Sequence, residues 1–203
     1  MLFPDKKALI VDVDGTLYNQ KKLRIYMLFR LLIYYFSHFW KIKELIGIFL
    51  FRKYRYKDVY KSLSNNELVD IIADKLHTSR YTISDARHYW MDIFPLKYLA
   101  KYKYYDFVRW LNNGERNVYV YSDYETAAKL DALRLRYSDA FYPDGKNILS
   151  VKPDKQSMSY ILNKIGISKE YILYIGDDDK KDGESAKLVD IDYLNIKDVL
   201  KYM

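Results

Sequence analysis

The feature that most constrains the fold of this chain is an alternation of short apolar segments with longer amphipathic ones. Residues 8–13, Ala-Leu-Ile-Val-Asp-Val, form an apolar run that ends in acids at an Asp-Gly-Thr turn, which predicts a buried strand. Further strands are predicted at 118–123, 140–142, 172–175 and 191–194, and helices at 125–135, 154–165 and 181–188. Strands that alternate with helices favour an α/β fold, with a Rossmann-like, mostly parallel sheet flanked by helices.

A long helical stretch separates the first predicted strand from the second. Between residues 21 and 112 the apolar residues recur at helical spacing, and Asn113-Gly114 supplies an end signal for the last helix. So much helix between two strands of one sheet predicts an inserted all-helical cap. We therefore expect a Rossmann-like catalytic core formed by residues 1–18 and 115–203, and a helical cap formed by residues 19–114.

The residue content excludes several classes of function. The chain contains no Cys, so a disulfide framework, a thiol nucleophile and a Cys-based metal site are excluded. The sequence also lacks the glycine-rich dinucleotide motif, the P-loop, the zincin motif and the serine-hydrolase motif. The first residues lack the basic start and continuous apolar run of a signal peptide, so we expect a cytoplasmic protein.

Most of the positive charge lies in one segment. The whole chain has a formal charge of +7, and residues 21–57 contain ten Lys and Arg against a single acid, Glu44. The segment thus carries +9 and the remainder −2, and this confinement argues against a nucleic-acid-binding protein. Two interpretations stay open: a solvated basic face on helices that pack into the cap, or a surface that attracts phosphate or an anionic membrane.

The longest apolar stretch, Ile25 to Phe51, is interrupted by charges, so no transmembrane span is expected and any membrane contact through residues 21–57 would be peripheral. One helix in this stretch has a wide apolar arc, made of Ile25, Leu28, Phe29, Leu32, Phe36 and Phe39. An arc this wide predicts that the helix buries or docks most of its circumference.

Polar side chains follow several of the predicted strands. They lie in Asp12-Val-Asp14-Gly15-Thr16, Ser122-Asp123, Lys152-Pro153 and Gly176-Asp177-Asp178-Asp179-x-x-Asp182. Ligands of such folds bind at the carboxyl ends of the strands, where these segments would meet. A carboxylate nucleophile divides phosphoester hydrolysis into two displacements, and a second carboxylate can protonate the leaving oxygen and then deprotonate water. Asp12 and Asp14 fit these two parts, while Mg²⁺ and the ammonium of Lys152 would neutralise the phosphate.

These segments, in this order, resemble the motifs of the haloacid dehalogenase (HAD) superfamily, in its phosphatase type with a helical cap inserted after the first strand. The resemblance covers about residues 6–18 and 117–195. It implies that Asp12 is the nucleophile that becomes phosphorylated and that Asp14 is the general acid and base. It further implies that Ser122 binds the transferring phosphoryl group and that Lys152 neutralises charge on both that group and Asp12.

The resemblance also implies a Mg²⁺ site. Its protein ligands would be a carboxylate oxygen of Asp12, the backbone carbonyl of Asp14 and a carboxylate oxygen of Asp177. Asp178 or Asp182 would orient the waters on the metal or Lys152, and helix capping is the alternative for both. Asp123 is a candidate substrate-binding residue, and capping of the helix that starts near Glu125 is its alternative.

An acid at position 14 favours a phosphatase, since the dehalogenases of the superfamily lack one there. The sequence thus predicts a Mg²⁺-dependent phosphomonoester hydrolase that acts on a small-molecule or lipid-linked phosphate. The alternatives are a phosphotransferase that passes the phosphoryl group to a sugar hydroxyl, and a membrane- or partner-binding regulatory module that retains the site. The substrate is not specified, because the cap sets selectivity in this architecture and is the part that matches the family least.

Overall fold

The computed structural model describes residues 3–55, 57–60, 63, 65–144 and 146–203. By their contacts these residues form two compact units, one made of residues 1–21 and 99–203 and the other of residues 22–98. The first unit is the α/β unit and the second is the helical unit.

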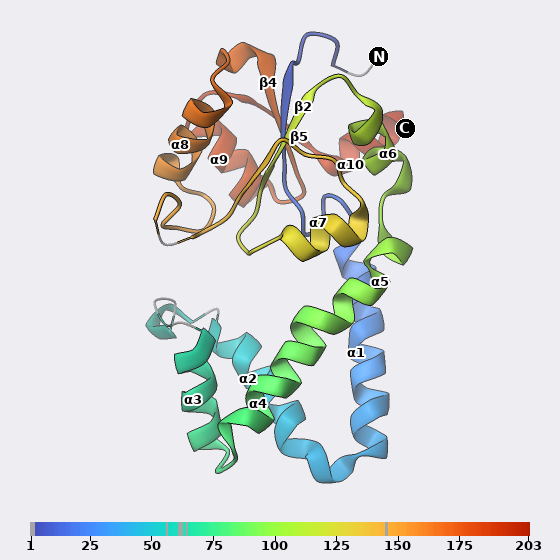
Figure 1. The fold of residues 1–203 in the computed structure, drawn as a ribbon, viewed down its shortest axis with the longest axis vertical. Helices are drawn as coiled ribbons and strands as arrows, with labels where there is room; N and C mark the ends of the chain where they lie inside the picture. The colour runs from blue at the N-terminus through green and yellow to red at the C-terminus, as the bar shows by residue number, and fades with distance from the viewer. Residues whose placement is uncertain (1–2, 56, 61–62, 64, 145) are drawn as a thin grey trace. The chain divides into compact units, whose positions relative to one another are not determined.

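The α/β unit is built on a five-stranded sheet whose strands are all parallel, in the order β3-β2-β1-β4-β5 (Figure 1). The strands are β1 (Ala8–Val11), β2 (Asn117–Tyr121), β3 (Asp139–Phe141), β4 (Ile172–Gly176) and β5 (Asp192–Asn195). Strand β1 is central and fully buried, which explains its unbroken apolar sequence. The predicted α/β fold with a mostly parallel sheet is confirmed.

Helices cover both faces of this sheet (Figure 1). The α-helices of the unit are α6 (Tyr105–Asn113), α7 (Ala127–Leu133), α8 (Lys155–Ile165), α9 (Glu184–Lys187) and α10 (Ile196–Val199), and short 3₁₀ or π turns occupy Lys169–Tyr171, Asp179–Gly183 and Leu200–Tyr202. Ala8 and Ile10 pack in one apolar cluster with Met158 of α8 and Ala186 of α9. The alternate residues of the same strand face the other side of the sheet, because side chains along a strand alternate.

The register of the sheet brings three strand ends together. Val11, the last residue of β1, lies beside Val120 of β2 and Ile175 of β4. The residues that follow these positions along each strand therefore leave the sheet at one edge, which is where ligands of open α/β sheets bind.

The helical unit lies between β1 and β2 in the sequence, as predicted. Its elements are α1 (Gln20–Ser37), the 3₁₀ helix η1 (Phe39–Lys41), α2 (Ile42–Arg55), a 3₁₀ turn (Asp58–Tyr60), α3 (Asn65–Lys75), α4 (Arg80–Arg87), a π segment (His88–Ile93) and the first part of α5 (Phe94–Tyr102), which continues into the α/β unit. Apolar side chains from α2, α3 and α4 form one cluster around Phe51, Leu68, Ile72 and Ile83. No helix in the described part of the chain combines the length and the apolar character that crossing a membrane requires.

Residues 99–114, which the sequence analysis assigns to the cap, belong by their contacts to the α/β unit. The reason is that α6 is tied to that unit at both ends. The backbone N–H of Tyr104 donates to the carbonyl of Leu17 at 3.0 Å, and the side-chain amide of Asn112 donates to the carbonyl of Arg134 at 2.8 Å. The extents of the two domains, as functional parts of the protein, stay a prediction.

Candidate active site

The loop after β1 turns sharply beside the end of β4. Asp12 is 5% exposed, and its backbone N–H donates to the carbonyl of Ile175 at 3.0 Å. Gly15 has φ +106°, and a Cβ at this position would lie 2.1 Å from Oδ2 of Asp177. Only glycine combines this backbone conformation with so close an approach. The loop therefore holds Asp12 and Asp177 against each other.

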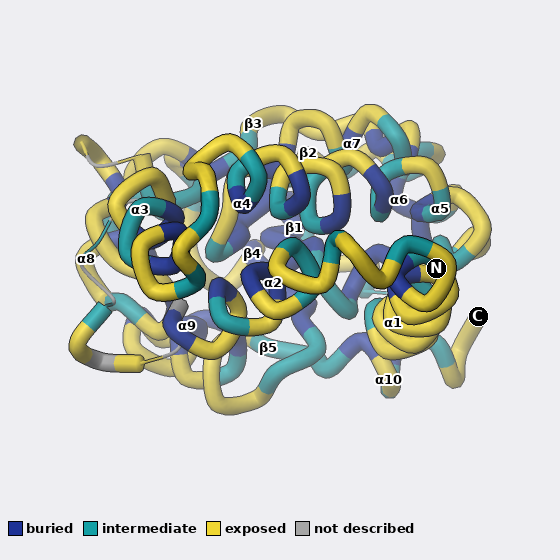
Figure 2. The backbone as a smooth tube through the Cα atoms, turned by 90° about the horizontal axis from the view of Figure 1, so that it is seen from below, coloured by how far each residue is buried: buried dark blue, intermediate teal, exposed yellow. Residues whose placement is uncertain are grey.

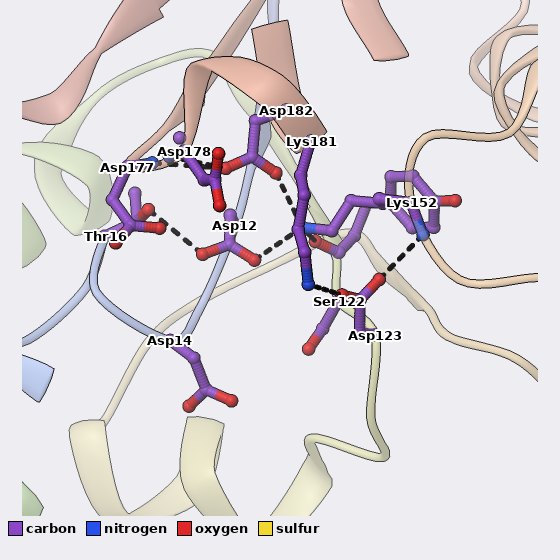
Figure 3. Close-up of polar contacts among 12 residues, drawn as sticks. Asp12, Asp14, Thr16, Ser122, Asp123, Lys152, Asp177, Asp178, Lys181 and Asp182 are labelled. Carbon is purple, nitrogen blue, oxygen red and sulfur yellow. Dashed lines mark hydrogen bonds and ion pairs between the residues drawn. The ribbon is translucent and has the colours of Figure 1, made fainter. Parts of the chain in front are cut away.

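Lys152 is the buried cation of the site (Figure 3). Its side chain is 3% exposed, and Nζ donates to Oδ1 of Asp12 at 2.6 Å and to Oδ1 of Asp182 at 2.7 Å. A third hydrogen bond, at 3.2 Å, goes to the carbonyl of Tyr121. Burial alone would lower the pKa of Lys152, but Asp12 and the other anionic groups around it raise that pKa well above its usual range. Lys152 is thus a permanent positive charge.

Three carboxylates converge beside Lys152. Asp12, Asp177 and Asp182 each offer a carboxylate oxygen, and these oxygens all lie within 4.8 Å of one another. Burial raises the pKa of Asp12 to about 7, with Lys152 opposing the rise and Asp182 adding to it. Burial together with Asp182 and Asp178 raises the pKa of Asp177 to about 6. One lysine is therefore too little positive charge for this cluster, since both carboxyls are harder to ionise than in water.

A divalent cation fits this arrangement. Hard carboxylate oxygens are the ligands that Mg²⁺ prefers, and a bound cation would lower the pKa of the carboxyls that contact it. Asp12 and Asp177 are the residues that would hold it. The main-chain carbonyl of Asp14 is the third ligand that the sequence analysis expects.

Asp182 is held by other partners. Oδ1 accepts from the hydroxyl of Tyr174 at 2.9 Å as well as from Lys152, and Oδ2 accepts from the backbone N–H groups of Asp177 and Asp178 at 3.2 Å each. Gly176 permits this packing, because a Cβ there would lie 2.3 Å from Oδ2 of Asp182. This geometry suits a residue that orients Lys152 and the loop of Asp177.

Asp178 has a different position. It precedes the π turn at Asp179–Gly183, and its carboxylate accepts from the backbone N–H of Lys180 at 3.0 Å. It is not part of the three-carboxylate group that the described residues form. The structure therefore gives Asp178 the capping contact that was the alternative, and its role toward a metal stays a prediction.

Ser122 and Asp123 follow β2 directly. Ser122 is 1% exposed, and its Oγ accepts from the backbone N–H of Tyr124 at 3.3 Å. Asp123 accepts from the backbone N–H of Lys152 at 2.8 Å and from Nζ of Lys181 at 2.9 Å. The residue at the N-cap of α7 is Thr126, so the alternative that Asp123 caps this helix is wrong. Asp123 instead connects the loops that carry Lys152 and Lys181.

Asp14 is held by a residue that the sequence analysis missed. Nζ of Lys129, in α7, lies 2.6 and 2.7 Å from the two carboxylate oxygens of Asp14, and the hydroxyl of Tyr18 also donates to Asp14. In Figure 3 the carboxylate of Asp14 points away from that of Asp12. Thr16, which the sequence analysis places in the first polar segment without a role, donates its hydroxyl hydrogen to Oδ2 of Asp12 at 3.1 Å. Asp14 is thus held by Lys129 of α7 and by Tyr18.

The site therefore has two parts, both built from the α/β unit. One is a buried carboxylate, Asp12, that has one oxygen on Lys152 and the other on Thr16, with Asp177 beside it. The other is a half-buried carboxylate, Asp14, held by a lysine. Such a pair can perform nucleophilic attack and proton transfer at one edge of the sheet.

Comparison with known proteins gives a family and a set of structural neighbours. The sequence model of the haloacid dehalogenase-like hydrolases matches residues 6–190. A structure of the HAD-hydrolase YfnB of Bacillus subtilis, bound to magnesium, is similar with TM-score 0.60 and 17% identity, over 93% of this chain and 87% of that chain. No protein with a curated description matches the sequence.

Two further neighbours have different named activities. The defluorinating L-2-haloacid dehalogenase Rha0230 is similar with TM-score 0.62 and 14% identity, over 95% of this chain and 83% of that chain. A Lactobacillus plantarum protein named as a phosphoglycolate phosphatase is similar with TM-score 0.54 and 15% identity, over 94% of this chain and 86% of that chain. At these identities the neighbours share the fold, and they do not distinguish a phosphatase from a dehalogenase.

Proposed function

Because this chain belongs to the haloacid dehalogenase-like hydrolases, we propose that it is a Mg²⁺-dependent phosphomonoester hydrolase that works through a phosphorylated Asp12. The observation that carries the proposal is the second carboxylate, Asp14, held at the same strand end by Lys129. A halide leaves without a proton, whereas an alkoxide that leaves a phosphate ester needs one. A positioned acid two residues after the nucleophile therefore supports ester hydrolysis.

In the first step, an oxygen of Asp12 attacks phosphorus and the bond from phosphorus to the ester oxygen breaks. Asp14 gives its proton to the leaving oxygen, so the alcohol departs neutral and Asp12 carries the phosphoryl group. In the second step, Asp14 takes a proton from water, and the resulting hydroxide attacks the phosphoryl group. Inorganic phosphate leaves and the carboxylate of Asp12 is restored.

The other residues act on charge and position. Lys152 already contacts the nucleophilic carboxylate, and its fixed positive charge offsets the negative charge that gathers on the phosphoryl oxygens. Ser122, at the end of β2, would donate its hydroxyl hydrogen to a phosphoryl oxygen. Asp12 and Asp177 would hold Mg²⁺, which when bound supplies the charge that lets a phosphate dianion approach these carboxylates.

The test compares two reactions on the purified protein. We expect release of inorganic phosphate from p-nitrophenyl phosphate with Mg²⁺ and none with EDTA, and no halide release from 2-chloropropionate. Asp12→Asn is the matched control, because it removes the nucleophile and nearly keeps the shape of the side chain. Halide release without phosphate release would establish a dehalogenase instead. A phosphorylated alcohol formed from an added acceptor, in place of inorganic phosphate, would establish a phosphotransferase.

A further inference from the structure

Helix α1 has apolar side chains around much of its circumference, and the helical unit buries only some of them. Leu31 and Tyr35 are buried and pack with Ile48 of α2 and Trp90 of the π segment. The other apolar side chains include the arc that the sequence analysis expects to be buried or docked, and its last member, Phe39, lies in η1 because α1 ends at Ser37. In the structure all six residues of that arc are exposed. The core of the helical unit therefore does not explain them.

The exposed apolar residues continue through the turn into α2. Together they form the outer face, which consists of Ile25, Leu28, Phe29, Leu32, Ile33, Phe36, Phe39, Trp40, Ile42, Ile46 and Phe49. The most exposed are Phe36 at 90%, Phe39 at 74% and Trp40 at 64%, at the end of α1 and in η1. Figure 2 shows most of α1 in the colour of exposed residues.

The outer face is unlike the rest of the described surface. Among the described residues, every Phe and Trp that is exposed belongs to it. Within α1 its members recur at spacings of three and four residues, which places them on one side of the helix. Exposed apolar side chains gathered in this number on consecutive elements of a folded protein mark an interaction site.

Positive charge surrounds this apolar surface. Lys21, Lys22, Arg24 and Arg30 are exposed on α1, among and beside the apolar residues. The segment 21–57 carries ten basic residues by sequence, although Tyr56 and the side chain of Arg55 lie outside the described residues. Its single acid, Glu44, already accepts a hydrogen bond from Tyr35 at 3.0 Å and pairs with Lys41 at 3.6 Å. A partner that is both apolar and anionic would therefore complement the outer face.

We propose that the outer face of α1, η1 and α2 docks on the surface of an anionic phospholipid bilayer. Phe39 and Trp40 would enter the boundary between headgroups and acyl chains, where aromatic rings are favoured, and the lysines and arginines would contact lipid phosphates. The helices would lie on the bilayer and not cross it. A second copy of the chain fits less well, because a symmetric dimer through this face would oppose two segments of +9.

The proposal is independent of the reaction that the α/β unit catalyses. It rests on α1, η1 and α2 alone, and none of their residues is part of the candidate active site. A protein without phosphatase activity could still bind membranes in this way.

The test is cosedimentation of the full chain with vesicles. Vesicles of phosphatidylcholine alone are compared with vesicles of phosphatidylcholine and phosphatidylserine at roughly 7:3, at low salt and at ~0.5 M NaCl. We expect binding to the anionic vesicles that weakens with salt, and little binding to the neutral ones. Trp40 is 64% exposed, whereas Trp90 is 5% exposed and Trp110, in α6 of the α/β unit, is partly buried, so a shift on binding reports chiefly Trp40. Its emission should shift to shorter wavelength on binding, and Trp40→Phe should remove most of the shift.

Two variants separate the two parts of the surface. The Phe variant, Phe36→Ser with Phe39→Ser, removes two apolar side chains. The charge variant removes four positive charges by Lys21→Gln, Lys22→Gln, Arg24→Gln and Arg30→Gln. Each basic residue near an anionic surface strengthens partition roughly fivefold, so the charge variant should bind on the order of several hundredfold more weakly. The matched control removes four exposed lysines from the α/β unit, at Lys155, Lys164, Lys187 and Lys201, and should bind like the wild type.

The outcomes are distinct. Weaker binding by both outer-face variants, with the control unchanged, supports the proposal. Binding that the Phe36→Ser, Phe39→Ser variant leaves intact, or that the control loses equally, would show adsorption by net charge and overturn it. No binding to anionic vesicles would also overturn it. A lipid-free dimer that the same Phe variant dissociates would assign the outer face to a second copy of this chain.

Discussion

The buried carboxylate of Asp12 should make the metal-free protein less stable as the pH rises, and Asp12→Asn isolates this effect. Asp12 is 5% exposed, and burial raises its pKa from 3.8 to about 7 in the folded protein. A difference of this size corresponds to at most about 4 kcal/mol between the stability at low pH and at high pH. We expect about 2–4 kcal/mol, because the surroundings relax around the charge.

The direction in which stability changes with pH follows from proton binding to Asp12. Between pH 3.8 and about 7 the folded state keeps a proton on Asp12 that the unfolded state has lost. The free energy of unfolding therefore falls as the pH rises through this range. Asn does not titrate, so the free energy of unfolding of the variant does not fall with pH for this reason. The change in the free energy of unfolding that Asp12→Asn causes in the metal-free protein should thus be more favourable above pH ~7 than at pH ~4.

The assay is urea unfolding of wild type and Asp12→Asn in EDTA, at pH ~4.5 and ~8. The free energy of unfolding of the variant, relative to that of the wild type, should be higher at pH ~8 than at pH ~4.5 by about 2–3 kcal/mol. Saturating Mg²⁺ should reduce the advantage of the variant, because a cation stabilises the ionised carboxylate of the wild type. An equal effect of the substitution at both pH values would refute the argument that burial raises the pKa of Asp12.

Further predictions concern single steps of the reaction and the metal. Asp14→Asn should slow turnover of an alkyl phosphate by about 10²–10⁴, measured as phosphate release, and leave the Mg²⁺ requirement unchanged. Lys129→Met should lower kcat by roughly tenfold or more with little change in KM, because Asp14 loses a partner that orients it. Lys129→Arg should keep part of the activity that Lys129→Met loses. A change in KM alone would argue against a positioning role for Lys129. Asp177→Ala should raise the Mg²⁺ concentration needed for half-maximal activity, whereas Asp179→Ala should not, since Asp179 contacts Tyr193 and Asn195. The reverse order of these two variants would show that the acidic loop is misassigned.

Much of the fold was predictable from the sequence, because each buried strand is a short apolar run and each helix has its own periodicity. All five predicted strands exist within two residues of their predicted ends. The predicted helix at 181–188 begins later, at Glu184, because the preceding turn carries Asp182 inward to Lys152 and Tyr174. The resemblance to the HAD superfamily is confirmed by the family match over residues 6–190.

Contacts between distant segments were not predictable. Lys129 meets Asp14 only because α7 follows β2, which pairs with β1, and nothing in the local sequence marks that lysine. The outer face shows the same limit. Periodicity shows that α1 is apolar on several sides, but packing decides which side finds a partner inside the unit. The side with Leu31 and Tyr35 packs, and the side with Phe29 and Phe36 does not.

The central claim, that Asp12 carries the phosphoryl group during turnover, can be measured directly. The protein is mixed with a phosphomonoester and Mg²⁺, quenched in acid during turnover, digested and analysed by mass spectrometry. We predict one added phosphoryl group on the peptide that contains Asp12, lost on treatment with hydroxylamine and absent in Asp12→Asn. Steady release of phosphate with no modified Asp12, or turnover that persists in Asp12→Asn, would contradict the account.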